Sequence, residues 1–240
     1  MNKTNDLLSK IDTFLKYLTK GFIVFVIFWC SSYLQYIPVK IFHIDIHNID
    51  TTMKVILSLF SSLIIFCIYF IIYRKDLIKD FKDYRQHKEE YKDIGIRYWL
   101  IGLFLMMIIN YILNVVLKAG GANNEKAVQQ MIASCPLLML IEAGIIAPFN
   151  EEIVFRKSLK DTFKNKWIFI ILSFLLFGGA HVLSSAKVMT DYLYIIPYGI
   201  LGASFAMAYY KTNNIFTSIS MHMIHNTILV LISIATLFLK

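Results

Sequence analysis

Six polar residues, spread over three apolar stretches of the chain, are of the types that hydrolytic chemistry uses. They are Glu151, Glu152, Arg156, His181, His222 and Asn226. A partly buried glutamate can act as general base on a water molecule, imidazoles can orient that water or hold a metal ion, and an imidazole and an amide can donate to an oxyanion. A single histidine in an apolar segment is more often a packing residue, but several of them with a carboxylate pair indicate a site.

The stretch with the two adjacent carboxylates predicts that each carboxylate has its own partner. Glu152 and Arg156 are four residues apart, so on a helix they share a face and can form an ion pair. Glu151 is rotated by roughly 100° from its neighbour and can face a cavity instead. Pro148 has no N–H for the carbonyl four residues before it, so we expect the helix to kink just ahead of the pair.

Further polar residues of the apolar segments are expected to flank this site or to support it. His222 and Asn226 are four apart and share a helix face, and His225 could line the same cavity. Glu142 lies nine residues before the first carboxylate of the pair, on the opposite side of a regular helix. We expect it to make a buried polar contact, for example to the asparagines of the preceding apolar segment, and not to be catalytic.

The distance of His181 from the start of its segment determines how long the helix of Glu151 must be if the two side chains are to meet. Counted from Trp167, His181 lies roughly 21 Å along its helix, whereas Glu151 lies only about 8 Å from Arg156. The two side chains can meet if the helix of Glu151 extends beyond Arg156 within the protein. We predict that extension.

The composition identifies a polytopic, all-α membrane protein. Of the 240 residues, 58% are hydrophobic and 17% are charged, with a mean hydropathy of +0.61, whereas soluble domains average about 45–50% apolar and about 25% charged residues. The net charge of +8 lies in short segments between apolar runs, so we expect no nucleic-acid partner. The three cysteines indicate no disulfide framework, and no cleavable signal peptide is evident.

The apolar runs predict a transmembrane bundle of about seven (seven or eight) helices with the catalytic cavity inside it. They cover about 21–36, 55–73, 98–117, 137 to the carboxylate pair, 167–183, 189–210 and 215–239. The mixed-charge segment 74–97 is expected to be a solvated helix or hairpin at the headgroups, and 120–124 a flexible loop. We expect one membrane domain, in which N-terminal helices and a basic loop (1–136) precede a catalytic core (137–240).

The distribution of basic residues predicts the orientation in the membrane. With the N-terminus inside, the inner segments hold 18 Lys and Arg residues and the outer segments hold 6. Because an excess of basic residues marks the cytoplasmic side, we expect a multi-pass protein of the cell membrane with its N-terminus in the cytoplasm and its C-terminus outside. The carboxylate pair then lies toward the cytoplasmic side.

Three short motifs, in this order, are similar to one family. Glu-Glu-x-x-x-Arg at 151–156, Phe-x-x-x-His at 177–181 and His-x-x-x-Asn at 222–226 resemble the CPBP family, the CAAX-protease and bacteriocin-processing intramembrane proteases that are called the Abi family in bacteria. The resemblance covers roughly residues 137–230, and Pro148 also fits it. Lys157 departs from it, because the family often has glycine after the arginine.

The resemblance implies a role for each site residue. Glu151 would be the general base that activates water, helped by His181, while Glu152 would pair with Arg156 or assist at the site. The oxyanion would be stabilised by His222 and the asparagine four residues later. The cofactor stays open: the first glutamate and the two histidines could hold Zn²⁺, and a metal-free, glutamate-dependent mechanism is equally compatible with these side chains.

The resulting hypothesis is an intramembrane endopeptidase that cuts a peptide or a small membrane-associated protein. The composition is rich in Lys, Ile, Phe and Asn, which suggests an AT-rich bacterium, so maturation of a peptide pheromone or bacteriocin, or self-immunity to one, is the favoured role. The alternatives are a non-catalytic membrane scaffold or immunity protein and a proton-coupled transporter. No internal repeat of the kind that transporters carry is evident.

Overall fold

The computed structural model describes residues 3–45 and 48–239, and within these ranges the chain forms helices and no strand. The elements are α1 (Lys3–Trp29), η1 (Ser31–Gln35), α2 (Tyr36–Ile41), α3 (Thr51–Gln86), α4 (Lys88–Tyr111), η3 (Ile112–Val116), α5 (Asn123–Ser134), α6 (Pro136–Ile141), η4 (Glu142–Ile146), α7 (Ala147–Glu152), η5 (Ile153–Lys157), α8 (Ser158–Thr162), α9 (Lys166–Val182), η6 (Met189–Tyr194), α10 (Ile195–Thr212) and α11 (Ile215–Leu237). The segments η1 and η6 are 3-10 helices, and η3, η4 and η5 are π-helical.

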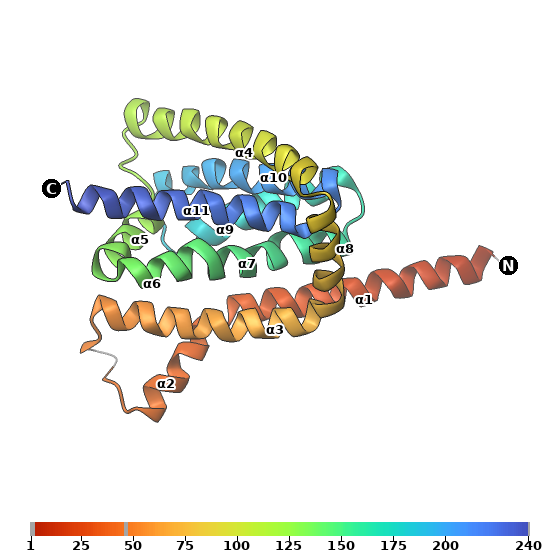
Figure 1. Cartoon of the computed structure of the whole chain (residues 1–240), viewed down its shortest axis with the longest axis horizontal. Helices are drawn as coiled ribbons and strands as arrows, with labels where there is room; N and C mark the ends of the chain where they lie inside the picture. Colours follow the sequence, from red (N-terminus) through yellow and green to blue (C-terminus); the bar gives the residue numbers. More distant parts are fainter. Residues whose placement is uncertain (1–2, 46–47, 240) are drawn as a thin grey trace.

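The long helices lie side by side along the long axis of the molecule, and α9 sits among them (Figure 1). Among the described residues, four helices are long and apolar enough to cross a membrane, or five if a pair bent by 48° counts as one span. They are Thr51–Gln86, Lys88–Val116, Met189–Thr212 and Ile215–Leu237, and the bent pair is Asn5–Trp29 with Ser31–Ile41. The all-α membrane bundle predicted from composition is confirmed.

The number of helices that meet this length and composition test is smaller than the seven apolar runs. The run at 167–183 became α9, which has only 17 residues. The run that leads into the carboxylate pair became the helical segment 136–162, which changes between α and π geometry four times. Reading hydrophobicity along the sequence finds apolar runs but does not show where π turns divide a helix.

Several helices extend well beyond their apolar runs. The polar segment 74–97 is helical almost throughout, because α3 continues to Gln86 and α4 begins at Lys88, and it crosses one end of the bundle from α3 to α4 (Figure 1). The N-terminal half of α1 is already helical and projects from the bundle (Figure 1). The stretch expected to be a flexible loop holds only a short turn, with Gly120 and Gly121 at φ +82° and +84°, before α5 starts at Asn123. The helix α5 was not predicted.

Asparagine side chains start the two helices that carry the histidines. Asn165 Oδ1 accepts from the backbone N–H of Trp167 at 2.9 Å and so caps α9. Asn214 caps α11 in the same way, through the N–H of Phe216 at 3.0 Å. Asn213, with φ 52°, ends α10 in the left-handed conformation that asparagine tolerates. These caps fix where α9 and α11 begin, and so they determine how far along each helix His181 and His222 lie.

The irregularity predicted before the carboxylate pair is the π-helical segment η4, which ends just before Pro148. The missing proline N–H leaves carbonyls of this segment without their regular helical partners. Side chains from α11 supply donors: Asn226 Nδ2 lies 2.9 Å from the Ala143 oxygen, and Thr227 Oγ1 lies 3.5 Å from the Gly144 oxygen. The free carbonyls of η4 are therefore hydrogen-bonded to α11, the helix that carries His222 and Asn226.

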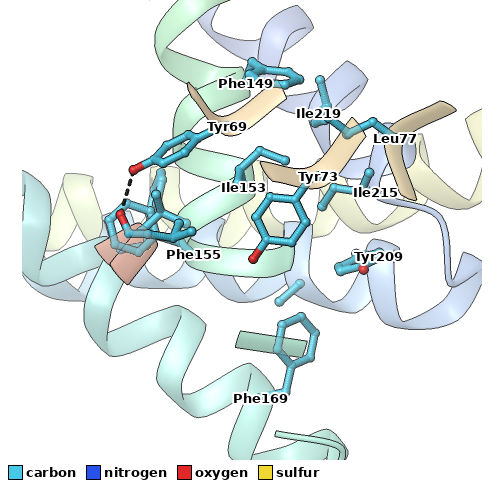
Figure 2. Packing of buried hydrophobic residues seen from close by; sticks show 14 of the residues in the cluster. Tyr69, Tyr73, Leu77, Phe149, Ile153, Phe155, Phe169, Tyr209, Ile215 and Ile219 are labelled. Carbon is cyan, nitrogen blue, oxygen red and sulfur yellow. Dashed lines mark hydrogen bonds between the residues drawn. The ribbon is translucent and has the colours of Figure 1, made fainter. Parts of the chain in front are cut away.

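The main core holds the helix of the carboxylate pair against α1, α3, α9 and α10. Tyr69, Tyr73, Ile153 and Phe155 are buried at its centre, with exposed fractions of 0–1% (Figure 2). The Tyr69 hydroxyl donates to the Val24 carbonyl oxygen at 2.7 Å, the dashed contact in Figure 2. These contacts fix α1 and α3 on one side of the segment 136–162.

On the other side, α9 and α10 pack at backbone distance through glycines. A Cβ atom at Gly178 would lie 2.5 Å from the Ile195 carbonyl oxygen, and one at Gly202 would lie 3.1 Å from Phe177. No larger residue fits at Gly178 without separating the helices, since contacts below 3.0 Å are essentially never made by a real Cβ. This close packing brings the side chains of α10 next to His181.

Candidate active site

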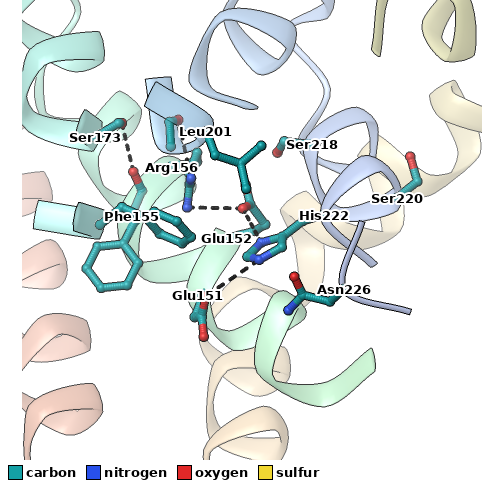
Figure 3. Close-up of polar contacts among 12 residues, drawn as sticks. Glu151, Glu152, Phe155, Arg156, Ser173, Leu201, Ser218, Ser220, His222 and Asn226 are labelled. Carbon is teal, nitrogen blue, oxygen red and sulfur yellow. Dashed lines mark hydrogen bonds and ion pairs between the residues drawn. The ribbon is translucent and has the colours of Figure 1, made fainter. Parts of the chain in front are cut away.

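The second carboxylate of the pair is engaged in a fully buried ionic network. Glu152 and Arg156 have exposed fractions of 0%, and Glu152 Oε1 lies 3.0 Å from Arg156 Nη1. The same oxygen lies 2.8 Å from His222 Nδ1 (Figure 3). The guanidinium also donates to the Gly202 carbonyl oxygen and lies over the Phe177 ring, at 3.2 Å and 4.3 Å. The ion pair predicted from the four-residue spacing is formed.

Glu151 points away from that network and toward both imidazoles. Its Oε2 lies 3.7 Å from His222 Nε2 and 3.9 Å from His181 Nε2. The oxygen is buried and has no hydrogen-bond partner. The structure thus brings residues of α7, α9 and α11 together. The helix of Glu151 continues six residues beyond Arg156 to Thr162, which is the predicted extension.

The hydrogen bonds of the two rings define which nitrogen faces Glu151. His181 Nδ1 lies 2.9 Å from the Phe177 carbonyl oxygen, which can only accept, so Nδ1 carries a hydrogen. His222 Nδ1 lies against the Glu152 carboxylate and is assigned in the same way. In the neutral rings both Nε2 atoms are then acceptors, like the Glu151 oxygen. Three acceptors meet with no donor among them, and such a group requires a water molecule, a proton or a cation.

The donor types in this group are ones that zinc uses in proteins. In the described part of the chain, however, no group of three His, Cys, Asp or Glu side chains is already arranged at the distances of a metal site. The Nδ1 contacts of both histidines are the kind that orient metal ligands and catalytic bases alike.

Asn226 and His225 do not point at Glu151. Asn226 Nδ2 donates to the Ala143 carbonyl oxygen. His225 is turned toward α4, where its Nδ1 accepts from Trp99 Nε1 at 3.2 Å. His225 lies only about 60° around α11 from His222, and both rings pack on Phe205, but its Nδ1 is held by Trp99, so it does not join His222 at Glu151 as the sequence suggested.

Glu142 makes the buried polar contact that was predicted, but with a different helix. Its Oε1 accepts from the hydroxyls of Ser58 and Ser62 on α3, at 3.2 and 2.7 Å. The expected asparagine partners on the α4 side are elsewhere: Asn114 accepts from the Tyr194 hydroxyl at 2.5 Å. The reason is the packing order, since α4 packs on α10 while α3 packs on η4.

Two aromatic side chains of α10 complete the surroundings, and neither was identified from the sequence. Tyr198 stacks on His181, with ring centroids 4.7 Å apart and planes 23° apart. Phe205 stacks on His222, at 4.9 Å and 27°. The two aromatics are seven residues apart and so share one helix face. This seven-residue spacing could have indicated a shared aromatic face, but in so apolar a segment aromatic residues are expected anyway as packing residues.

Comparison with known proteins identifies the same segment of the chain. Residues 133–228 match the family model described as type II CAAX prenyl endopeptidase Rce1-like. The chain is 29% identical over 136 residues to the UPF0177 protein YxdF of Lactococcus lactis subsp. lactis (strain IL1403), covering 54% of this chain and 73% of YxdF. It is 29% identical over 140 residues to YdiL of Bacillus subtilis (strain 168), a candidate membrane peptidase, covering 57% of this chain.

The match extends over 54% of YdiL, so this chain spans about half the length of that relative. No solved structure matches the chain. All six residues singled out by type and spacing lie within the matched segment. The resemblance to the CPBP family is confirmed: residues 133–228 of this multi-pass membrane protein are similar to the Rce1-like family of type II CAAX prenyl endopeptidases.

Proposed function

We propose that the protein is an intramembrane endopeptidase in which Glu151 activates a water molecule for attack on a peptide carbonyl. One observation carries this proposal: the Glu151 carboxylate and two imidazole Nε2 atoms converge as three acceptors without a donor. A water molecule supplies the donors that the group lacks. The distances of 3.7 and 3.9 Å are too long for direct hydrogen bonds and are short enough for one bridging water.

The proposed reaction needs only this water and the peptide. Glu151, in its ionised form, takes one proton from the water as the water oxygen bonds to the peptide carbonyl carbon, and His181 Nε2 holds the other hydrogen and orients the attack. The carbonyl oxygen takes the negative charge. As the C–N bond breaks, the proton on Glu151 passes to the leaving nitrogen, which gives an amine and a carboxylic acid that keeps the second hydrogen of the water until it ionises in solution.

Glu152 and Arg156 act through His222 in this proposal. The Glu152 carboxylate holds the imidazole by Nδ1, and the Arg156 guanidinium balances the carboxylate charge in a site without water contact. The family resemblance implies that His222 stabilises the oxyanion, and its Nε2, an acceptor in the neutral ring, would have to take up a proton before it could donate there. Asn226 has a second amide hydrogen besides the one used for Ala143, and the resemblance assigns it to the same oxyanion.

The substrate class and the side of the membrane are part of the proposal. A peptide or a small membrane-associated protein suits a site enclosed by apolar helices, and pheromone or bacteriocin maturation or self-immunity is the role we favour. The excess of basic residues supports a cytoplasmic N-terminus and a site toward the cytoplasmic side. A resident zinc ion held by Glu151, His181 and His222 stays open as an alternative to the metal-free reaction, and metal analysis of the purified protein distinguishes the two.

The test compares peptides from membranes and medium of cells that carry the wild-type protein, Glu151→Gln or Glu142→Gln. The Glu142 variant is the matched control, since this buried glutamate lies on the same helix and outside the group of three acceptors. Mass spectrometry should detect cleavage products with wild type and with the control, and none with Glu151→Gln, because general base catalysis contributes about 100- to 10,000-fold. Products that persist with Glu151→Gln contradict the proposal and favour a non-catalytic scaffold.

A further inference from the structure

We propose that Tyr198 is a positioning residue for His181, an inference that deepens the proposed function and rests on it. The two imidazoles that face Glu151 are held unequally. His222 is fixed through Nδ1 by a buried carboxylate that is itself paired with Arg156. His181 has only a carbonyl of its own helix as Nδ1 partner. It is also the penultimate residue of α9, and its side chain is 19% exposed.

A hydrogen bond to the carbonyl four residues back restrains Nδ1 but leaves the ring free to tilt about that contact. Two aromatic rings restrict this tilt. Phe177 lies at 4.4 Å with its plane 45° from that of the imidazole, and Tyr198 lies at 4.7 Å and nearly parallel to it. Phe177 belongs to the same helix as His181, so it cannot fix the ring relative to other helices. Tyr198 belongs to α10 and therefore positions the His181 ring relative to that helix.

The backbone brings Tyr198 to this distance by close packing of α9 on α10. Its neighbour Gly199 lies against the Phe174 ring, where an added Cβ would be 2.8 Å away, and Gly178 of α9 packs against the α10 backbone. Seven residues on, Phe205 presents the same parallel contact to His222. One face of α10 therefore supports both imidazoles, with the glycines of this interface setting the separation.

Tyr198 is also tied to a third element. Its hydroxyl interacts with the Asn124 side chain at the start of α5. The preceding residue, Asn123, donates from Nδ2 to the Ser185 carbonyl oxygen at 3.1 Å and to Asp191 Oδ2 at 2.8 Å. These contacts connect α5 with the segment that follows α9. The position of His181 Nε2 relative to Glu151 thus depends on α10 as well as on α9, through the ring of Tyr198.

The expected effect follows from this geometry. Without the aromatic contact, the His181 ring can tilt away from the line to Glu151, and a misplacement of about 1 Å can cost about 100-fold in rate. Because Tyr198 supports the imidazole from behind, its loss should lower kcat and leave KM nearly unchanged. Tyr198→Phe keeps the ring and should stay within about threefold of wild type, whereas Tyr198→Leu and Tyr198→Met should lower kcat by about 10- to 100-fold.

The experiment uses the full chain in detergent micelles, with an internally quenched mixed decapeptide library as substrate probe and ¹⁵N-labelled histidine for NMR. Tyr192→Leu is the matched control, since this tyrosine of η6 is 43% exposed and the ring contacts of His181 are with Phe177 and Tyr198. The expected result is a fall in kcat for both aliphatic variants at unchanged KM, a shift of the His181 ring signals in the same variants, and wild-type behaviour for Tyr198→Phe and the control.

Wild-type kcat and wild-type His181 signals in Tyr198→Leu or Tyr198→Met overturn the inference. Two aliphatic replacements of different shape are included because one of them can fail to fold, and near-wild-type unfolding temperatures identify the usable one. If both unfold, the decision falls to Tyr198→Phe, whose His181 signals must match wild type. If no variant, wild type included, cleaves the library, the proposed function fails while the His181 signals still decide the inference.

Discussion

Replacing the two neighbouring carboxylates one at a time by glutamine should lower the unfolding temperature at one position and leave it unchanged or slightly higher at the other. Glu152→Gln leaves the fully buried Arg156 charge without its counter-ion, which was 3.0 Å away. Breaking a buried pair by removing one partner costs about 3–5 kcal/mol. In a chain of this size each kcal/mol lowers the unfolding temperature by about 2–4 °C, so a fall of about 6–20 °C is expected.

Glu151→Gln is the counterpart, because Glu151 Oε2 is buried without a hydrogen-bond partner and faces two imidazole acceptors. An amide N–H in its place can donate to either Nε2 atom after a shift of less than about 1 Å, and a new hydrogen bond contributes about 1 kcal/mol. The variant should therefore unfold at the wild-type temperature or about 2–4 °C above it. It should also be inactive.

The assay is thermal unfolding in detergent micelles, followed by the fluorescence of the three tryptophans. Glu142→Gln serves as a control for replacing a buried glutamate, and it should change the unfolding temperature little because the amide oxygen still accepts from the α3 serines. Equal falls for Glu151→Gln and Glu152→Gln would refute the division of roles between the two carboxylates. A neutral Glu152→Gln would show that the Arg156 charge is balanced by another group.

Three further predictions concern the supports of the site. Asn226→Ala removes the donor to the Ala143 carbonyl and should lower stability by about 1–3 kcal/mol in the same unfolding assay, while an unchanged temperature would show that water replaces the amide. Gly178→Ala places a Cβ 2.5 Å from the Ile195 oxygen, so it should prevent accumulation of folded protein; normal expression with normal unfolding would contradict the close packing of α9 on α10. His225→Phe should retain at least half of the wild-type rate of peptide cleavage, since this ring faces α4, and inactivation would place it in the site.

The long apolar helices of the bundle and the pairing of Glu152 with Arg156 were predictable because both depend on local sequence pattern. A four-residue spacing fixes a shared helix face whatever the rest of the fold does. The approach of Glu151 to the two histidines was predictable only through the resemblance, since nothing in the spacing of residues 151, 181 and 222 says that three separate helices meet at one depth.

Contacts that depend on which helices are neighbours were not predictable. Glu142 had several polar segments as possible partners, and only the packing of α3 on η4 selects the serines. The stacking of Tyr198 and Phe205 depends on the glycine contacts between α9 and α10. The π segments could not be predicted from the sequence for a related reason. A carbonyl of η4, that of Ala143, is hydrogen-bonded by Asn226 of another helix, and such a contact is not visible in the local sequence.

The central claim is that Glu151 delivers water to a peptide carbonyl, and peptide cleavage by the purified protein in H₂¹⁸O tests it most directly. We predict that wild type and Glu142→Gln give products whose new carboxyl group carries one ¹⁸O atom, and that Glu151→Gln gives no product. Cleavage by Glu151→Gln at the wild-type rate, or wild-type products without ¹⁸O after a single turnover, would contradict the account.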